Sequence, residues 1–307
     1  MIGVWSLWTK PVRELSAQPW ANEYHHQLSW ILSVQTARRH FSRTSLITDD
    51  AGARLLVDGL GLEFDSVSTE LNRIETCDAH WWSLGKLHAY AAQTEPFVHI
   101  DADVFLWKPL PRSVTDAPVF AQNFEPLVLP NPFYDIDRFR RIRERGAWLP
   151  PELDWLESSG RPPCAINCGI LGGNDIAFFN HYARSAIRLV LDESNLVPWE
   201  LERPDNLIVE QFYLAACLQS RGFDGFHGFD GQVARNGSGS RIACLFRDWA
   251  EAFDPAASRC AGFTHLIGPA KRNPYLLDLV ERRVAALHPQ YYERCRRQIG
   301  RGAPKRQ

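Results

Sequence analysis

In PFVHIDADVFLWKPL, residues 96–110, two acidic residues interrupt an otherwise apolar run. The apolar residues over 96–100 predict a buried strand, and Asp101 and Asp103 follow at its end. Two like charges at such a place are unfavourable, because they repel each other and lose their hydration. We therefore expect a positive charge between these two side chains.

Strands and helices alternate on the N-terminal side of this stretch. The pattern of apolar residues predicts strands over 2–8, 45–48 and 63–67, and helices over 20–40, 55–60 and 82–93. Such alternation indicates an α/β fold with a mostly parallel sheet covered by helices. Ligands of these sheets bind outside the carboxyl ends of the strands, which is where Asp101 and Asp103 lie.

The C-terminal half of the chain is more elaborate. We predict strands over 118–122 and 165–173, and helices over 175–191, 206–219 and 273–300. Residues 125–163, which are rich in proline and arginine, are expected to be irregular or inserted. Because the chain shows no internal repeat and no linker, we expect one domain over residues 1–307.

Composition excludes several classes of protein. The 307 residues are 45% hydrophobic and 23% charged, as in an ordinary globular protein, and the net charge of -2 gives no field that attracts nucleic acid. The seven cysteines are scattered without a CxxC pair, which predicts reduced thiols. No apolar run has the length of a membrane-spanning helix. These features predict a cytoplasmic protein.

The acidic pair has the spacing of a metal site. Residues two apart on an extended segment point to the same side, so Asp101 and Asp103 can both approach one cation. Carboxylate oxygens suit Mg²⁺ or Mn²⁺, and such an ion neutralises a leaving phosphate group. The alternative is a solvated turn after a strand, which the apolar residues on both sides of the pair make less suitable.

Four segments, in order along the chain, resemble a known family. They are SLGKLHAYAAQTEPFVHIDADVFLWKPL (83–110), INCGILGG (166–173), EQFYLAACL (210–218) and HLIGPAK (265–271). Together they resemble the core of retaining nucleotide-sugar glycosyltransferases of the glycogenin and galactinol synthase kind, glycosyltransferase family 8. The resemblance implies a single domain of the GT-A type with a Rossmann-like sheet and helices on both faces.

The resemblance also implies an activity. We expect a metal-dependent glycosyltransferase that uses Mn²⁺ or Mg²⁺ and moves a sugar from a nucleotide-diphosphate donor, by default a UDP-sugar, with retention of anomeric configuration. The acceptor is a hydroxyl of an unidentified glycan, lipid, protein or small molecule. Residues 1–122 would then form the nucleotide- and metal-binding half, 123–272 the acceptor- and sugar-binding half, and 273–307 a basic helical segment.

The expected metal and phosphate ligands come from two distant segments. His265 would complete the metal site with Asp101 and Asp103. Gly268 would let the backbone approach the diphosphate, and Lys271 would offer it a point charge. A lone histidine is usually structural and a lone lysine solvated, but the spacing H-x2-G-x2-K downstream of D-x-D favours a site.

The sugar-binding residues are expected in the other two segments and in the helix before the acidic pair. Lys86 would contact phosphate or sugar, and Asn167 would face the donor sugar or acceptor unless it caps the turn after it. Glu210 and Gln211 lie where the family has an Asp-Gln pair, and we group them with Asp103 and Asn167 as candidate catalytic residues. Retention through a covalent intermediate on Glu210 and retention by same-face attack both stay open.

Besides Glu210, which replaces the family's Asp, the sequence departs from the family in two further places. Lys271 is followed by Arg272-Asn273-Pro274, without the family's Trp after Lys-Pro. The N-terminal segment, where the family binds base and ribose, does not match closely, so uridine rests on the resemblance alone. The candidate contacts there are Trp5, Ser6 and Trp8.

Other functions and partners also have to be weighed. A nucleotidyltransferase would normally carry an early glycine-rich phosphate loop, which this sequence lacks. A non-catalytic module that binds a nucleotide sugar or a partner is the other alternative. The basic runs at 138–146 and 293–307 suit peripheral contact with anionic lipid or an acidic acceptor, or else are solvated helix faces.

Overall fold

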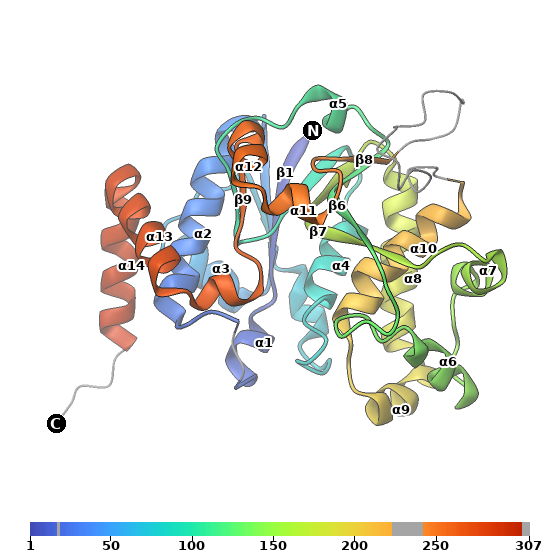
Figure 1. The fold of residues 1–307 in the computed structure, drawn as a ribbon. Coiled ribbons are helices and arrows are strands. Elements are labelled where there is room, and N and C mark those ends of the chain that lie inside the picture. Colours follow the sequence, from blue (N-terminus) through green and yellow to red (C-terminus); the bar gives the residue numbers. More distant parts are fainter. Residues whose placement is uncertain (17–18, 223–241, 303–307) are drawn as a thin grey trace. The chain divides into compact units, whose positions relative to one another are not determined.

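The computed structural model describes residues 1–16, 19–222 and 242–302 (Figure 1). The described strands form a seven-stranded sheet of order β3-β2-β1-β4-β7-β6-β8 and a two-stranded sheet of β5 and β9. The bounds are β1 (Ile2–Leu7), β2 (Thr44–Thr48), β3 (Ser66–Ser68), β4 (Phe97–Ile100), β5 (Val104–Leu106), β6 (Val119–Pro126), β7 (Cys164–Gly173), β8 (Ile242–Cys244) and β9 (Phe263–His265). The predicted α/β class with a mostly parallel sheet is confirmed.

Helices flank the sheet. They are α1 (Thr9–Glu14), α2 (Glu23–Ala37), α3 (Asp50–Ala53), α4 (Leu84–Ala91), α5 (Arg112–Thr115), α6 (Asp137–Glu144), α7 (Pro151–Ser159), α8 (Ile176–Leu191), α9 (Glu193–Glu202), α10 (Tyr213–Ser220), α11 (Trp249–Phe253), α12 (Pro255–Ala261), α13 (Pro274–Leu287) and α14 (Pro289–Gly302). Shorter helical turns are η1 (Arg38–His40), η2 (Arg54–Gly59), η3 (Glu70–Ile74), η4 (Ile208–Phe212) and η5 (Gly268–Arg272).

Two predictions of secondary structure need correction. The stretch 125–163 is not simply irregular, because it contains α6 and α7. The single helix predicted over 273–300 is two helices, α13 and α14, which are separated at His288 because Pro289 lacks the N–H that would continue the first one. The last five residues of the predicted basic segment, 303–307, lie outside the described residues.

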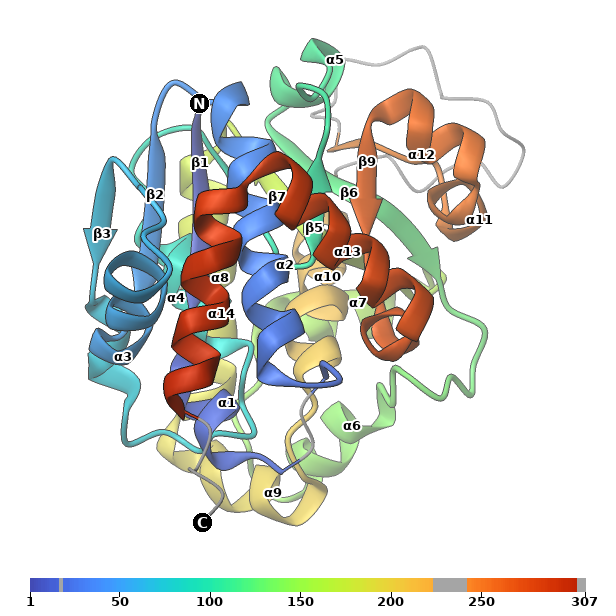
Figure 2. The ribbon, with the colours of Figure 1, turned by 90° about the vertical axis from the view of Figure 1, so that its left-hand side faces the viewer.

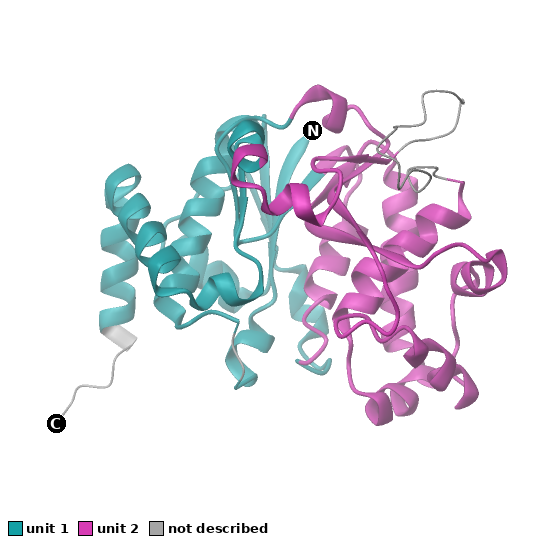
Figure 3. Ribbon diagram, viewed as in Figure 1, with its two compact units in different colours: residues 1–79, 98–110, 258–307 teal, residues 80–97, 111–257 magenta. Residues whose placement is uncertain are grey.

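The chain divides into two compact units that alternate along the sequence (Figure 3). The first unit comprises residues 1–79, 98–110 and 258–307, and the second comprises 80–97 and 111–257. The two units follow different boundaries from the predicted functional halves 1–122 and 123–272, and the roles assigned to those halves remain predictions.

In the first unit, β1, β2 and β3 are parallel neighbours, with Gly3 opposite Thr44. Helix α2 packs against β5, α13 and α14, and Figure 2 shows α13 and α14 beside it. Asn22 caps α2 by accepting a hydrogen bond from the backbone N–H of His25. The buried residues of α2 include both apolar and hydroxyl side chains, and the hydroxyls of Ser29 and Ser33 contact the segment that follows β4.

In the second unit, β6 and β7 form an antiparallel pair, and every residue of β7 is buried. The Asp175 carboxylate caps α8 at the backbone N–H of Phe178. Aromatic rings fill the space between α4, α8 and α10. The rings of Phe178 and Tyr182 stack with their centres 6.4 Å apart, and the ring centres of Tyr182 and Tyr213 are 6.0 Å apart. The core of this unit is therefore built largely from aromatic side chains.

The basic run 138–146 is compensated within the second unit. Each of its arginines lies within ion-pair distance of a carboxylate: Arg138 of Asp135 and Asp205, Arg140 of Glu144, Arg141 of Asp135 and Glu202, Arg143 of Asp154 and Glu157, and Arg145 of Glu202. Because these charges are paired, the run has little positive charge left for a lipid surface. The predicted peripheral membrane contact stays untested.

The cysteines and the helices bear on the predicted cytoplasmic location. The seven cysteines all lie within the described residues, and none of them forms a disulfide there. Among the described residues, no helix is both long enough and apolar enough to cross a membrane.

Gly173 provides a test of how β7 ends. Its φ is +150°, and a Cβ built on it would lie 2.1 Å from the Pro118 carbonyl oxygen. We expect Gly173→Ala to lower the free energy of unfolding by about 3 kcal/mol or more, because both backbone strain and a clash with the main chain oppose it. Urea unfolding followed by circular dichroism measures this.

Gly160→Ala is the matched control. Gly160 ends α7 with a φ of +66°, and a Cβ there would meet nothing within 4 Å. Strain alone should lower the free energy of unfolding by about 1 kcal/mol. Equal effects of the two substitutions would show that the contact with Pro118 is unimportant.

Candidate metal centre

Asp101 and Asp103 lie directly after β4, in a turn of the first unit that helix α2 holds in place. The backbone N–H of Val104 donates to the Asp101 carbonyl at 3.0 Å. Two hydroxyls on one face of α2 complete the turn: Ser33 Oγ donates to the Asp101 carbonyl at 3.1 Å, and Ser29 Oγ to the Ala102 carbonyl at 2.5 Å. These bonds satisfy carbonyls that have left the strand ladder, and they fix both carboxylates.

The β5–β9 ladder brings His265 to the acidic pair. These strands are antiparallel with Val104 opposite His265, and the Leu266 N–H donates to the Asp103 carbonyl at 3.0 Å. As a result, His265 Nε2 lies 3.3 Å from Asp103 Oδ1. A one-residue change of register would turn the imidazole to the other face of the strand pair.

The donor set fits a divalent cation. Asp101, Asp103 and His265 each offer one ligand atom, and these atoms all lie within 4.8 Å of one another. The side chains of Asp103 and His265 are only 8% and 10% exposed, whereas Asp101 is 23% exposed and leaves the group open to solvent on one side. Two carboxylates and an imidazole with open positions are ligands that Mn²⁺ and Mg²⁺ accept. The predicted ligands are therefore together and can hold a metal ion.

Lys271 also reaches the group, from η5. Its Nζ lies 2.5 Å from Asp103 Oδ2. Burial alone would raise the pKa of Asp103, but Lys271 and His265 outweigh it and hold this pKa well below its ordinary value. Asp103 is thus an anion whose charge is shared between an ammonium, an imidazole and any bound cation.

A cluster of aromatic rings next to Lys271, formed by Trp20, His26 and Trp30, was not predicted from the sequence. The Lys271 Nζ lies 6.0 Å from the centre of the Trp20 ring. That ring stacks on the His26 imidazole, with the two ring centres 6.0 Å apart. Trp30 Nε1 donates to His26 Nε2 at 3.1 Å. Burial lowers the pKa of His26 to about 4, and the nearby Lys271 charge adds to that effect. No motif identifies these residues, since they become neighbours of Lys271 only through the fold.

A second histidine lies behind Asp101. His99 is buried in β4, its Nε2 is 2.9 Å from Ser6 Oγ, and its Nδ1 is 3.7 Å from Asp101 Oδ1. Ser6 was predicted to contact a nucleotide. In the structure its hydroxyl hydrogen-bonds to His99, which in turn lies beside Asp101 of the candidate metal centre. The signal for His99 was present in the sequence, because it precedes Asp101 by two residues and shares its face of the strand.

The other N-terminal candidates are both tryptophans. Trp5 is fully buried and donates from Nε1 to Ser33 Oγ at 3.0 Å, so it supports the hydroxyl that holds Asp101. With no exposed surface, it is a core residue in this structure and not the nucleotide contact that was expected. Trp8 is also buried, at the end of β1, and its Nε1 has no hydrogen-bond partner among the described residues.

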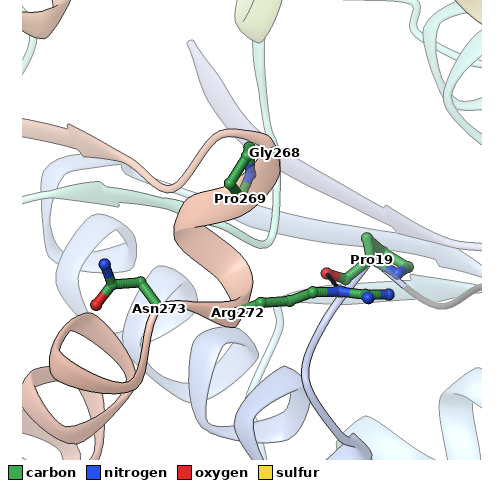
Figure 4. Close-up of a pocket in the computed structure, with 5 residues that line it drawn as sticks. All are labelled: Pro19, Gly268, Pro269, Arg272 and Asn273. Atoms are coloured by element: carbon green, nitrogen blue, oxygen red, sulfur yellow. Dashed lines mark hydrogen bonds between the residues drawn. The ribbon is translucent and has the colours of Figure 1, made fainter.

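Gly268 begins η5 beside an open hollow (Figure 4). Its φ of +52° is left-handed, and a Cβ on it would meet nothing within 4 Å. The hollow has a volume of about 480 Å³ and is lined by Pro19, Gly268, Pro269, Arg272 and Asn273. Arg272 Nε donates to the Pro19 carbonyl, which ties η5 to the loop before α2. Backbone is therefore accessible next to Lys271, and the predicted approach of Gly268 to a diphosphate remains a prediction.

In the second unit, Lys86 and Glu210 form a buried ion pair. Lys86 Nζ lies 2.7 Å from Glu210 Oε1, and the side chain of Glu210 has no exposed surface. Tyr90 OH donates to the same oxygen at 3.3 Å, and Lys86 Nζ also donates to the Cys168 carbonyl at 3.3 Å. Glu210 lies in the π-type turn η4, an irregularity that is frequent at functional sites.

Asn167 and Gln211 are joined by two residues that the sequence did not single out. Asn167 Nδ2 donates to Glu125 Oε1 at 2.9 Å, while Tyr134 OH lies 2.6 Å from both Glu125 Oε2 and Gln211 Oε1. Burial and then the charge of Glu125 raise the pKa of Tyr134, so its hydroxyl stays protonated. The predicted sugar-binding residues of the second unit thus form two polar clusters, one around Glu210 and one around Glu125.

A protein-family model covers residues 1–298 and is described as a family of unknown function (DUF6734). No curated protein matches the chain.

The low pKa of His26 predicts a pH-dependent stability. The neutral imidazole is favoured in the folded protein, because its pKa is about 4 there and about 6.5 in the unfolded chain. The resulting stabilisation is complete above pH 6.5 and is lost as the pH falls toward 4. With EDTA present, we expect the free energy of unfolding to fall by about 2 kcal/mol more in the wild type than in His26→Gln between pH 6.5 and 5. Parallel curves for the two proteins would contradict this prediction.

Removing the charge of Glu210 should be costly. Glu210→Gln leaves the Lys86 ammonium without its partner, and we expect the free energy of unfolding to drop by about 3 kcal/mol. The double variant Lys86→Met with Glu210→Gln should recover part of that loss, as followed by tryptophan fluorescence in urea. The matched control is Glu144→Gln, which removes the exposed partner of Arg140 and should change stability by less than about 0.5 kcal/mol. A similar effect at both glutamates would contradict the buried pair.

Proposed function

The chain belongs to this family of unknown function (DUF6734), and we propose that it is a metal-dependent glycosyltransferase. The reaction moves a sugar from a nucleotide-diphosphate donor, with a UDP-sugar as the default, to a hydroxyl acceptor. Cysteines that form no disulfide among the described residues are consistent with the cytoplasmic location that the composition predicts.

One observation carries the proposal. Asp101, Asp103 and His265 offer a divalent cation three ligands, and Lys271 adds an ammonium beside Asp103. Departure of a nucleoside diphosphate leaves negative charge on phosphate oxygens, and a cation with a nearby ammonium stabilises that charge. A bound metal supplies the Lewis acid; Lys271 supplies a second positive charge and is free to exchange Asp103 for a phosphate oxygen.

The resemblance to retaining glycosyltransferases supports the finer assignment. Of the segments with the expected residue types, those in the first unit bring together the candidate metal ligands and Lys271. Those in the second unit form two polar clusters, and in one of them Glu210 Oε2 is buried without a hydrogen-bond partner among the described residues. Glu210 is buried and paired with Lys86, which makes it a poor nucleophile as it stands, because its charge is already compensated. This favours same-face attack over a covalent intermediate on Glu210.

Binding of UDP to the purified protein tests the proposal. We expect binding in Mn²⁺ that disappears in EDTA, measured by titration calorimetry. Asp103→Asn should weaken Mn²⁺ binding by about 100-fold, because it removes the charge of a ligand. Asp116→Asn, at an exposed carboxylate after α5, is the control and should bind as the wild type does.

Turnover separates the enzyme from a binding module. Hydrolysis of a UDP-sugar that needs Mn²⁺ and is lost in Asp103→Asn supports transfer chemistry. Metal-dependent UDP binding without any turnover of UDP-sugars would favour a nucleotide-sugar-binding module. Equal UDP binding in Mn²⁺ and EDTA, or wild-type activity of Asp103→Asn, would overturn the proposal.

A further inference from the structure

The β5–β9 strand pair leads away from the metal group to a second, basic pocket. Asp103 and His265 flank one end of the pair, and at the other end the Trp107 N–H donates to the Gly262 carbonyl at 2.8 Å. The pocket there has a volume of about 300 Å³, and its lining includes Trp107, Lys108, Arg259, Gly262, Thr264 and Arg283. Neither Asp103 nor His265 lines this pocket, so the pocket and the candidate metal centre share no residue.

Lys108 is held in the pocket by the backbone. Its Nζ donates to the carbonyls of Arg259 and Cys260, at 3.3 and 3.0 Å. Its stem lies against Gly262, whose φ is +63° and where a Cβ would approach Lys108 Cγ to 2.5 Å. Any side chain at 262 would therefore displace Lys108, so the glycine is what allows this lysine to lie there.

Trp107 orders two more cations. The Arg283 guanidinium lies 4.8 Å from the centre of its ring, and Arg39 donates to its carbonyl at 3.0 Å. The indole itself is fixed by a hydrogen bond from Nε1 to Thr264 Oγ1 at 3.0 Å. Each contact orders a basic side chain that would otherwise be free in solvent, and ordering a long side chain is entropically unfavourable.

The positive charges of this pocket are not compensated. Among the described residues, no carboxylate lies within ion-pair distance of the three cations that line it, Lys108, Arg259 and Arg283. This contrasts with α6, where every arginine is paired, and with the neighbouring Arg282, which pairs with Asp278. Like charges gathered around one pocket repel each other, and an anion would relieve that repulsion.

We propose that this pocket binds a small organic anion: a phosphate or carboxylate group carried on a body of about the size of a sugar. The cations supply the charge, and the hydroxyl of Thr264 and the indole of Trp107 supply polar and apolar contacts for the attached body. The site is distinct from the metal centre and requires no metal, so it stands whether or not the protein is a glycosyltransferase.

Titration calorimetry in EDTA tests the site, since chelation keeps anions from binding through a metal at Asp103. The probes are glucose 6-phosphate, glucuronate and inorganic phosphate. We expect at least one of the two sugar acids to bind with a Kd below about 1 mM, and inorganic phosphate to bind more weakly, because it lacks the attached body. Asp103→Asn should leave the Kd of the sugar acid unchanged.

The variants distinguish the pocket from general attraction to a basic surface. Arg283→Gln and Lys108→Gln should each raise the Kd of the sugar acid about tenfold. Arg282→Gln, at the residue just before Arg283 on α13, should change this Kd less than twofold. Failure of both sugar acids to bind below about 10 mM would overturn the proposal, and so would equal losses in Arg282→Gln and Arg283→Gln. Circular dichroism of each variant checks that the fold is retained.

Discussion

The negative charge of Asp103 is the constraint around which the first unit is arranged. A buried carboxylate is stable only where positive charge and hydrogen bonds replace its lost hydration. Here Lys271 provides the charge, and His265 and Lys271 lie within hydrogen-bonding distance. Those two residues reach Asp103 by different routes, one through the register of β5 and β9 and the other through η5. A divalent cation fits the same need, which is why a structural requirement and a chemical capacity coincide at this place.

The second unit meets the same constraint in another way. Glu210 is buried deeper than Asp103, yet its partners are a lysine and two tyrosines, with Tyr90 OH donating to its carboxylate and Tyr182 OH to its carbonyl. Those groups contact Oε1 and the backbone carbonyl, while Oε2 is buried without a hydrogen-bond partner among the described residues. The two acidic centres therefore differ in kind: the one in the first unit is open to an ion on one side, while the one in the second unit is closed by protein groups.

The pocket at Trp107 reverses the situation, because it gathers positive charge and no carboxylate of the described part of the chain balances it. It shares a strand pair with the metal centre, so the two sites of opposite sign are ordered by the same few hydrogen bonds. Short strand pairs of this kind position side chains accurately with little buried area, because each ladder bond fixes a residue on either strand.

The sequence by itself determined the α/β class and the strand that ends in Asp101 and Asp103, because alternating elements and apolar runs are local patterns. Its resemblance to the glycosyltransferase family also pointed to His265 and Lys271 as candidates, through the pattern H-x2-G-x2-K. Only the tertiary structure decided that Trp5 is a core residue, that His26 and His99 lie behind the metal group, and that Lys108 and Arg283 share a pocket. These relations depend on strand register and helix packing between segments far apart in the chain, and no local pattern of residue types specifies them.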